Sequence, residues 1–136
     1  MITAVDTSVL LEVLRARPDS RPASLHTLRR CLAEGSLVAC DVVWAEVASE
    51  FVSPADCRRA LELLSVSYDA IAQTAALAAG TRFRAYRAHG GPRARILPDF
   101  LVAEHAAAQA DRLLTRDRGF YRGYFSDLVI VDPNVT

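Results

Sequence analysis

Four acidic side chains lie at points where the sequence pattern changes from one expected element to the next. Asp6 closes the apolar run from Ile2 to Val5, where a buried strand is expected to give way to a helix. A carboxylate is costly to bury unless it is paired, hydrogen-bonded or bound to a metal ion, so this position requires a partner. The full set is Asp6, Glu46, Asp99 and Asp117.

Carboxylates that share one site must hold protons or cations. Two like charges about 4 Å apart repel by about 4 kcal/mol at an effective dielectric constant near 20. Oxygen ligands without His or Cys favour Mg²⁺ or Mn²⁺, which activate a bound water and stabilise the leaving oxygen of a phosphodiester. Four acids suit one or two such ions. The hydroxyls of Thr7 and Ser8 are candidates to bind a metal water or a phosphate oxygen.

The elements that would position these acids alternate between strand and helix along the chain. This alternation predicts an α/β fold of three α/β/α layers, with a short parallel sheet flanked by helices, as a single domain over residues 1–136. Strands are expected at 2–6, 37–40, 65–68, 112–115 and 128–131, helices at 7–16, 22–34, 41–52, 54–64, 69–88 and from 98, and an irregular or short helical segment at 116–125.

Three polar or flexible residues mark the expected helix ends. Asp41 is a plausible N-cap, and Gly35 is expected to stop the helix that Pro22 opens. The stretch "SPAD" is close to a capping box, with Ser53 as the N-cap and Pro54 as the first helical residue.

The expected topology places all four acids on one rim. Ligands of open parallel sheets bind beyond the carboxyl ends of the strands. Asp6 ends the first strand and Asp117 follows the "RLLT" strand, while Asp99 starts the helix that leads into that strand. Glu46 lies one turn into the helix after the second strand. The joint placement therefore favours a shared site.

Each acid also has a structural explanation. Asp6 could cap the first helix, and Asp99 could interact with the helix dipole. Glu46 could face solvent, with Glu50 one turn on as its rival for the site. Asp117 could pair with a flanking arginine, either Arg116 or Arg118.

Composition narrows the remaining possibilities. Acidic and basic residues balance at 16 each, so net charge does not indicate a nucleic-acid partner. All the basic residues are arginine, which excludes lysine-dependent chemistry. The three scattered cysteines predict neither disulfides nor a zinc site, and they suit a reducing cytoplasm. No signal peptide and no apolar run of about 20 residues is evident, so we expect no membrane segment.

The blocks "VDTSVLLEVL", "WAEVA", "LPDFLVAEHA" and "LLTRDRGFYRGYF" ahead of "LVIVDP" resemble the PIN-domain ribonucleases, in particular the VapC toxins of toxin–antitoxin pairs. The resemblance covers nearly the whole chain and keeps the motif order. It implies a PIN-like fold, Mg²⁺- or Mn²⁺-dependent RNA cleavage, homodimers and inhibition by a VapB-type antitoxin. It also implies a metal site at the positions of Asp6, Glu46, Asp99 and Asp117.

Arginines and aromatic residues near two of the acids suggest an RNA path. Arginine neutralises phosphates and aromatic faces stack on unpaired bases, although the aromatics could equally belong to the core. The candidate RNA-binding residues are Arg93, Arg95, Arg116, Arg118 and Arg122, with Phe120, Tyr121 and Tyr124 interleaved.

Two other classes of protein compete with a nuclease. Receiver domains need a lysine that this chain lacks, and haloacid-dehalogenase-type phosphatases need a second acid where Ser8 stands. A non-catalytic PIN-like module that binds RNA or protein remains the main alternative, although the full set of acids counts against it. His26, His89 and His105 lie away from the motifs and receive no role.

Overall fold

The computed structural model describes residues 1–92 and 95–134. Its centre is a five-stranded, all-parallel sheet in the order β3-β2-β1-β4-β5. The fold predicted from the alternating pattern is therefore confirmed. The strands are β1 (Ile2–Val5), β2 (Ser36–Ala39), β3 (Val66–Tyr68), β4 (Arg112–Leu114) and β5 (Ile130–Val131).

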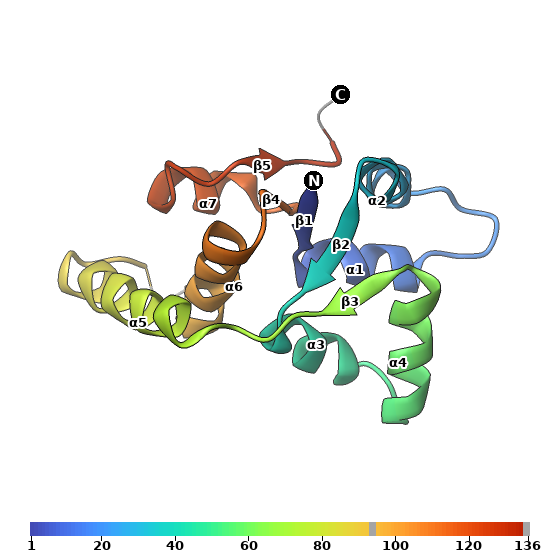
Figure 1. Cartoon of the computed structure of the whole chain (residues 1–136), viewed down its shortest axis with the longest axis horizontal. Coiled ribbons are helices and arrows are strands. Elements are labelled where there is room, and N and C mark those ends of the chain that lie inside the picture. Colours follow the sequence, from blue (N-terminus) through green and yellow to red (C-terminus); the bar gives the residue numbers. More distant parts are fainter. Residues whose placement is uncertain (93–94, 135–136) are drawn as a thin grey trace.

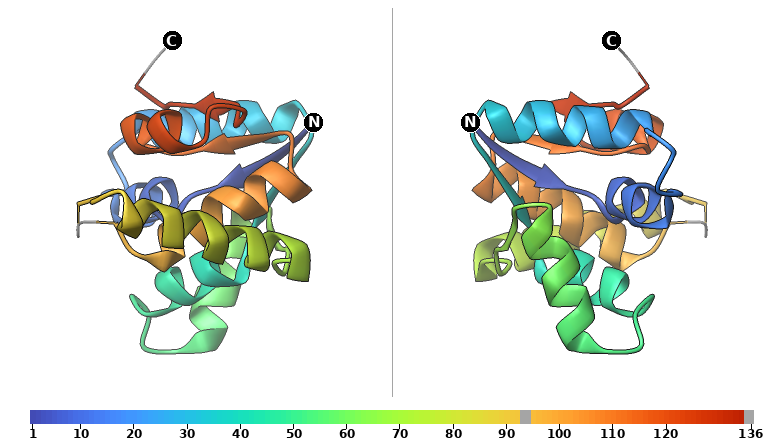
Figure 2. Two further views of the ribbon diagram at one scale, coloured as in Figure 1. Left: turned by 90° about the vertical axis from the view of Figure 1, so that its left-hand side faces the viewer. Right: turned by 90° about the vertical axis from the view of Figure 1, so that its right-hand side faces the viewer.

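Helices cover both faces of this sheet (Figures 1 and 2). One face carries α1, α2 and α4, and the other carries α5, α6 and α7, while α3 packs against both α1 and α6. None of the helices within the described ranges is long and apolar enough to cross a membrane. The helices are α1 (Thr7–Arg15), α2 (Ala23–Ala33), α3 (Asp41–Ala48), α4 (Pro54–Leu63), α5 (Gln73–Ala88), α6 (Leu97–Gln109) and α7 (Arg118–Tyr124).

Two predicted helices are shorter in the structure. The helix predicted over 41–52 ends at Ala48, and the Ser49 hydroxyl donates to the carbonyl of Glu46 at 2.6 Å. The helix predicted over 69–88 begins at Gln73. The Asp69 N–H instead bonds to the carbonyl of Ala39, which continues the β2–β3 pairing past the strand end.

The predicted caps are partly wrong. Asp41 is the first residue of α3, and Cys40 takes the N-cap position. Ser53 does stand at the N-cap of α4 ahead of Pro54, but its side chain makes no capping hydrogen bond. Gly35 does follow α2, and a Cβ there would lie 1.8 Å from the carbonyl oxygen of Met1, so this close approach requires glycine.

A cluster of aromatic rings anchors the second half of the fold. Phe100, on α6, is fully buried and lies 5.5 Å from Phe120 and 5.2 Å from Tyr86, measured between ring centroids. Phe100 directly follows Asp99 in the chain, so this packing fixes the start of α6. His105, one turn further along the same helix, is buried and lies 2.8 Å from the carboxylate of Asp69.

Candidate metal centre

Asp6 is buried at the carboxyl end of the central strand, between the end of β1 and the start of α1. Its Oδ1 accepts the backbone N–H of Thr7 at 2.8 Å, which makes it the N-cap of the helix. Its Oδ2 accepts the hydroxyl of Thr115 at 2.7 Å, and the hydroxyls of Ser8 and Tyr121 both lie 3.5 Å from the same oxygen. Capping thus uses one carboxylate oxygen, and the other faces hydroxyls from α1, from the residue after β4 and from α7.

Thr115 links two of the predicted acids. Its hydroxyl oxygen donates to Asp6 and accepts the backbone N–H of Asp117 at 3.0 Å. Because β4 lies beside β1 in the sheet, this one buried side chain sets the position of Asp117 relative to Asp6. The sequence argument did not identify Thr115. Its place at the end of a predicted strand, beside Asp117, is the signal that could have found it.

Glu46, rather than Glu50, faces this site. The Thr7 hydroxyl donates to Glu46 Oε1 at 2.7 Å. Because Thr7 directly follows Asp6 in the chain, this hydrogen bond holds the Glu46 side chain near Asp6. Glu50 pairs with Arg15 at the exposed end of α1. The geometry therefore favours Glu46 as the acid at the site.

Asp99 occupies the first turn of α6. Its Oδ2 accepts the backbone N–H of Ile96 at 3.0 Å, which stabilises the helix start and leaves its second oxygen free of hydrogen bonds within the described residues. Asp99 nevertheless acts on its neighbours, because its charge raises the pKa of both Asp6 and Tyr121. We call Asp6, Glu46, Asp99 and Asp117 together the acid rim.

Asp117 is held by an arginine, but not by either of the two flanking ones. Both terminal nitrogens of Arg95 contact its carboxylate, one of them at 3.0 Å. Arg95 also lies over the ring of Phe120, with 4.3 Å from its Cζ to the ring centroid. The structural explanation considered for Asp117 thus holds in kind but with another partner, because Arg95 reaches it from the loop before α6 in place of Arg116 or Arg118.

The electrostatics show that these acids share one environment. The pKa of Asp6 is raised from 3.8 to about 6, chiefly by burial and further by the charges of Glu46 and Asp99, while the hydrogen bonds from Thr115 and Thr7 lower it. Burial raises the pKa of the Tyr121 hydroxyl, and the charges of Asp6, Asp99 and Asp117 raise it further. A cation in this region would relieve the mutual repulsion.

The residues present fit a hard divalent cation in their chemistry. The rim offers carboxylate and hydroxyl oxygens, which Mg²⁺ and Mn²⁺ prefer. Across residues 1–92 and 95–134, no three acidic, His or Cys side chains stand close enough to enclose an ion in their present rotamers. The contacts explain this spacing, because Arg95 holds Asp117 and Asp99 turns to the N–H of Ile96.

The predicted RNA-binding residues differ in their surroundings. Arg95 is held by Asp117, and Arg122 is exposed in the last turn of α7. Arg93 lies outside the described residues. Arg116 pairs with Glu12 at 2.8 Å, and Arg118 lies 3.6 Å from Asp132. Two of the predicted stacking aromatics are instead core residues, because Phe120 and Tyr121 are buried; Tyr124 is 42% exposed.

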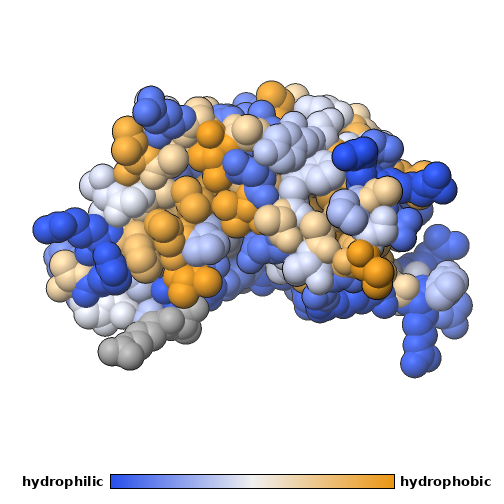
Figure 3. Space-filling model, turned by 90° about the horizontal axis from the view of Figure 1, so that it is seen from below, coloured by the Kyte–Doolittle hydropathy of each residue, from blue (hydrophilic) through white to orange (hydrophobic). Residues whose placement is uncertain are grey.

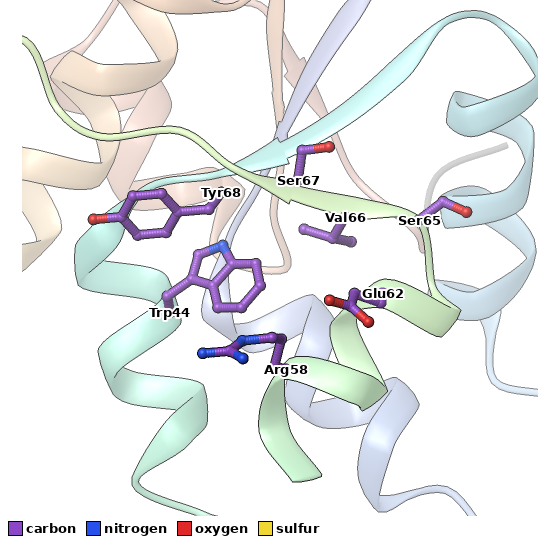
Figure 4. A pocket seen from close by; sticks show the side chains of 7 residues that line it. All are labelled: Trp44, Arg58, Glu62, Ser65, Val66, Ser67 and Tyr68. Atoms are coloured by element: carbon purple, nitrogen blue, oxygen red, sulfur yellow. The ribbon is translucent and has the colours of Figure 1, made fainter. Parts of the chain in front are cut away.

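The surface beside the rim is hollowed. Figure 2 shows the strands ending on the side where α1 begins, and in Figure 3 this side forms the lower edge of the outline, which curves inward between two lobes. A separate cavity of about 680 Å³ lies along β3 (Figure 4), where the Trp44 ring meets Tyr68 edge-on at 5.7 Å. None of the residues that line this cavity along β3 belongs to the acid rim.

Comparisons with known proteins agree with this architecture. The family model described as PIN domain matches residues 3–126. The fold is similar to that of VapBC-1 from nontypeable Haemophilus influenzae, with a TM-score of 0.75 and 21% identity over 99% of this chain and 100% of that chain. It is also similar to VapBC2 from Rickettsia felis bound to a promoter DNA fragment, with a TM-score of 0.73 and 18% identity over 97% of this chain and 98% of that chain.

A third solved structure, FitAcB from Neisseria gonorrhoeae, has a TM-score of 0.68 and 19% identity over 98% of each chain. At these identities the likeness establishes the fold. No curated protein matches this chain by sequence.

Proposed function

This chain belongs to the PIN-domain family, and from that premise we propose that it is a metal-dependent endoribonuclease whose active site is the acid rim. The observation that carries the proposal is Asp6. It is a buried carboxylate with a pKa of about 6, and two other rim acids lie close enough to raise that pKa. Capping of α1 accounts for one oxygen of Asp6 but not for the other acidic side chains around it, and a divalent cation would stabilise that grouping.

In this proposal Asp6, Asp99 and Asp117 hold the cation, and Glu46 either holds it or orients the attacking water. Mg²⁺, or Mn²⁺ in its place, would supply an activated water and a positive charge at the leaving oxygen of the phosphodiester. The Thr7 hydroxyl fixes the Glu46 carboxylate, and Thr115 fixes that of Asp6. Arg95, released from Asp117, can donate to a phosphate oxygen.

The biological setting that fits best is a toxin–antitoxin pair. Structures of similar fold include VapBC complexes and a toxin–antitoxin complex from Klebsiella pneumoniae. We therefore propose a VapC-type toxin that cleaves single-stranded or loop RNA in the cytoplasm, acts as a homodimer and is neutralised by a VapB-type antitoxin.

The deciding experiment incubates the purified chain with total RNA in Mg²⁺, in Mn²⁺ and in EDTA, and maps new 5′ ends. Asp6→Asn and Asp99→Asn proteins serve as matched controls, because each removes one charge from the rim. We expect cleavage at a few discrete sites that is lost in EDTA and in both variants. Identical fragments from wild type and variants would identify a contaminating nuclease and remove the support for the proposal.

The alternative, a non-catalytic module that binds RNA or protein, has one observation in its favour. Arg95 neutralises Asp117 from within the chain. Such a module should show no thermal stabilisation by Mn²⁺, whereas a metal-binding rim should be stabilised by it and should lose that response in Asp6→Asn.

A further inference from the structure

Another pocket lies next to the acid rim and extends along α1 from Ser8, in its first turn, to Arg15 at its end. Its volume is about 470 Å³, and the residues important for its chemistry are Ser8, Glu12, Arg15, Ser20 and Arg116. We call it the α1 pocket. Hydrophilic side chains gather at the right-hand end of the molecule in Figure 3, where Figure 1 places the loop that follows α1. The pocket opens to solvent and has a mixed lining, in which these polar side chains alternate with Leu11, Ala16 and Pro22.

Ser8 forms a wall that the α1 pocket shares with the rim. Its hydroxyl lies 3.5 Å from Oδ2 of Asp6 and accepts the backbone N–H of Arg116 at 3.2 Å. Arg116 is in turn the chain neighbour of Asp117. A strand of RNA held at the rim can thus continue into the pocket without crossing another element.

The lining of the α1 pocket carries one more positive than negative side chain, whereas the rim is acidic. Two arginines, Arg15 and Arg116, line it together with one carboxylate, Glu12, and the exposed Arg15 also pairs with Glu50, which lies outside the lining. Arg116 donates to Glu12 through a single terminal nitrogen at 2.8 Å, and its side chain is 45% exposed. A guanidinium has five N–H donors in a planar fork, so Arg116 can keep this ion pair and still donate to a phosphate.

We propose that the α1 pocket is a phosphate subsite for the nucleotide next to the one whose phosphodiester is cleaved. This inference rests on the proposed nuclease function of the rim. Arg15 and Arg116 would neutralise the phosphate, Ser8 and Ser20 would donate hydroxyl hydrogen bonds, and Glu12 would weaken binding by repulsion. Three of these residues are new to the site, since the sequence argument included none of them: Glu12, Arg15 and Ser20.

The lining also defines what the subsite recognises. No aromatic side chain is among the described residues that line the pocket, so it offers no surface on which a base can stack. Contacts to phosphate and sugar position a nucleic acid without reading its sequence. The α1 pocket should therefore add affinity and register but leave the choice of cleavage site to other contacts.

The test measures binding apart from cleavage. Fluorescence anisotropy of a short labelled single-stranded oligoribonucleotide is recorded in EDTA at several salt concentrations, for wild type and for Arg15→Ala, Arg116→Ala and Glu12→Gln. We expect each arginine variant to bind on the order of fivefold more weakly and its salt dependence to fall by about 0.7 in slope. Glu12→Gln should bind more tightly than wild type, because it removes a negative charge from the pocket.

The matched control is Arg59→Ala, which removes the same charge from an exposed position on α4 outside the pocket. The subsite would be overturned if the two pocket arginine variants had the same affinity and the same salt slope as Arg59→Ala. It would also be overturned if the wild type did not bind the oligoribonucleotide. Cleavage by the same samples in Mg²⁺ is assayed in parallel. If Asp6→Asn abolishes cleavage but the pocket variants bind RNA as the wild type does, the subsite is wrong and the proposed nuclease function still stands.

Discussion

Arg95 and Asp117 form a bidentate ion pair at the acid rim, in which both terminal guanidinium nitrogens contact the carboxylate. The hydrogen bond to Asp117 is the main reason that the pKa of Arg95 is raised. The arginine therefore neutralises the carboxylate that a divalent cation would also neutralise. A cation bound to Asp117 would have to displace Arg95 from the same oxygens.

Arg95→Ala should raise the affinity for Mn²⁺ by roughly fivefold, because the cation no longer has to displace a guanidinium whose ion pair is partly exposed. Isothermal titration calorimetry measures this directly. Arg87→Ala is the matched control, since Arg87 also lies over an aromatic ring, that of Phe83, at 4.7 Å. Unchanged Mn²⁺ affinity in Arg95→Ala would show that Asp117 does not take part in metal binding.

Asp6→Asn should stabilise the metal-free protein at neutral pH. The folded-state pKa of about 6 lies above the ordinary 3.8, so protonated Asp6 favours the folded state, and this contribution is lost as the pH rises through about 6. The difference corresponds to about 3 kcal/mol as an upper limit. Urea unfolding in EDTA at pH 4 and pH 7 should show a gain for Asp6→Asn at pH 7 and little difference at pH 4.

Adding Mg²⁺ should reverse that ranking. The cation stabilises the ionised carboxylate of the wild type and does little for the amide, so the melting temperature should rise only for the wild type. Equal thermal shifts in the two proteins would place the metal elsewhere.

Thr115→Val should weaken metal binding at mildly acidic pH. The Thr115 hydroxyl lowers the pKa of Asp6, so its removal moves that pKa further up, and protons compete with the cation to a higher pH. The variant should also lose about 1–2 kcal/mol of stability, because the N–H of Asp117 loses its acceptor. Thr115→Ser keeps the hydroxyl and should restore the pH profile, which a purely structural defect would not predict.

Glu46→Gln and Glu50→Gln should show which of two candidate acids acts at the site, Glu46 on α3 or Glu50 just beyond its end. Loss of Glu46 should slow RNA cleavage by roughly a hundredfold or more, the range expected for a group that positions a water or a proton. Loss of Glu50, which pairs with Arg15, should leave the rate within about twofold. The comparison uses initial rates on one defined RNA in Mg²⁺. The opposite ranking would move the site toward the end of α1.

The strands, most helix boundaries and the positions of the acids follow from local patterns, and the sequence predicted them. Apolar runs such as Ile2–Val5 mark buried parallel strands, because both faces of such a sheet are covered. The predicted start of α5 was four positions too early, because Asp69 is held by Ala39 and His105 from distant segments. Local spacing carries no information about such partners.

The details of the site depend in the same way on long-range contacts. Arg95 and Asp117 are 22 positions apart, and nothing in "TRDRG" indicates that the flanking arginines turn to Glu12 and Asp132 instead. The aromatic residues of the last helix gave an ambiguous signal for a physical reason. Phe120 and Tyr121 are as suitable for a core as for stacking on bases. The packing of Phe120 against Phe100, and of Tyr121 against Phe120, decided between the two.

The hydrogen bond between Thr115 and Asp6 joins residues 109 positions apart, and it has a consequence for synthesis on the ribosome. The central strand is made first, yet one of its two sheet neighbours, β4, is among the last segments to be translated. A nascent chain that has not yet released β4 lacks Asp117, one of the four rim acids, and it also lacks the Thr115 hydroxyl that donates to Asp6. Any activity of this site against RNA therefore begins only after translation of the domain is almost complete, when most of the coding segment for the domain has already been read.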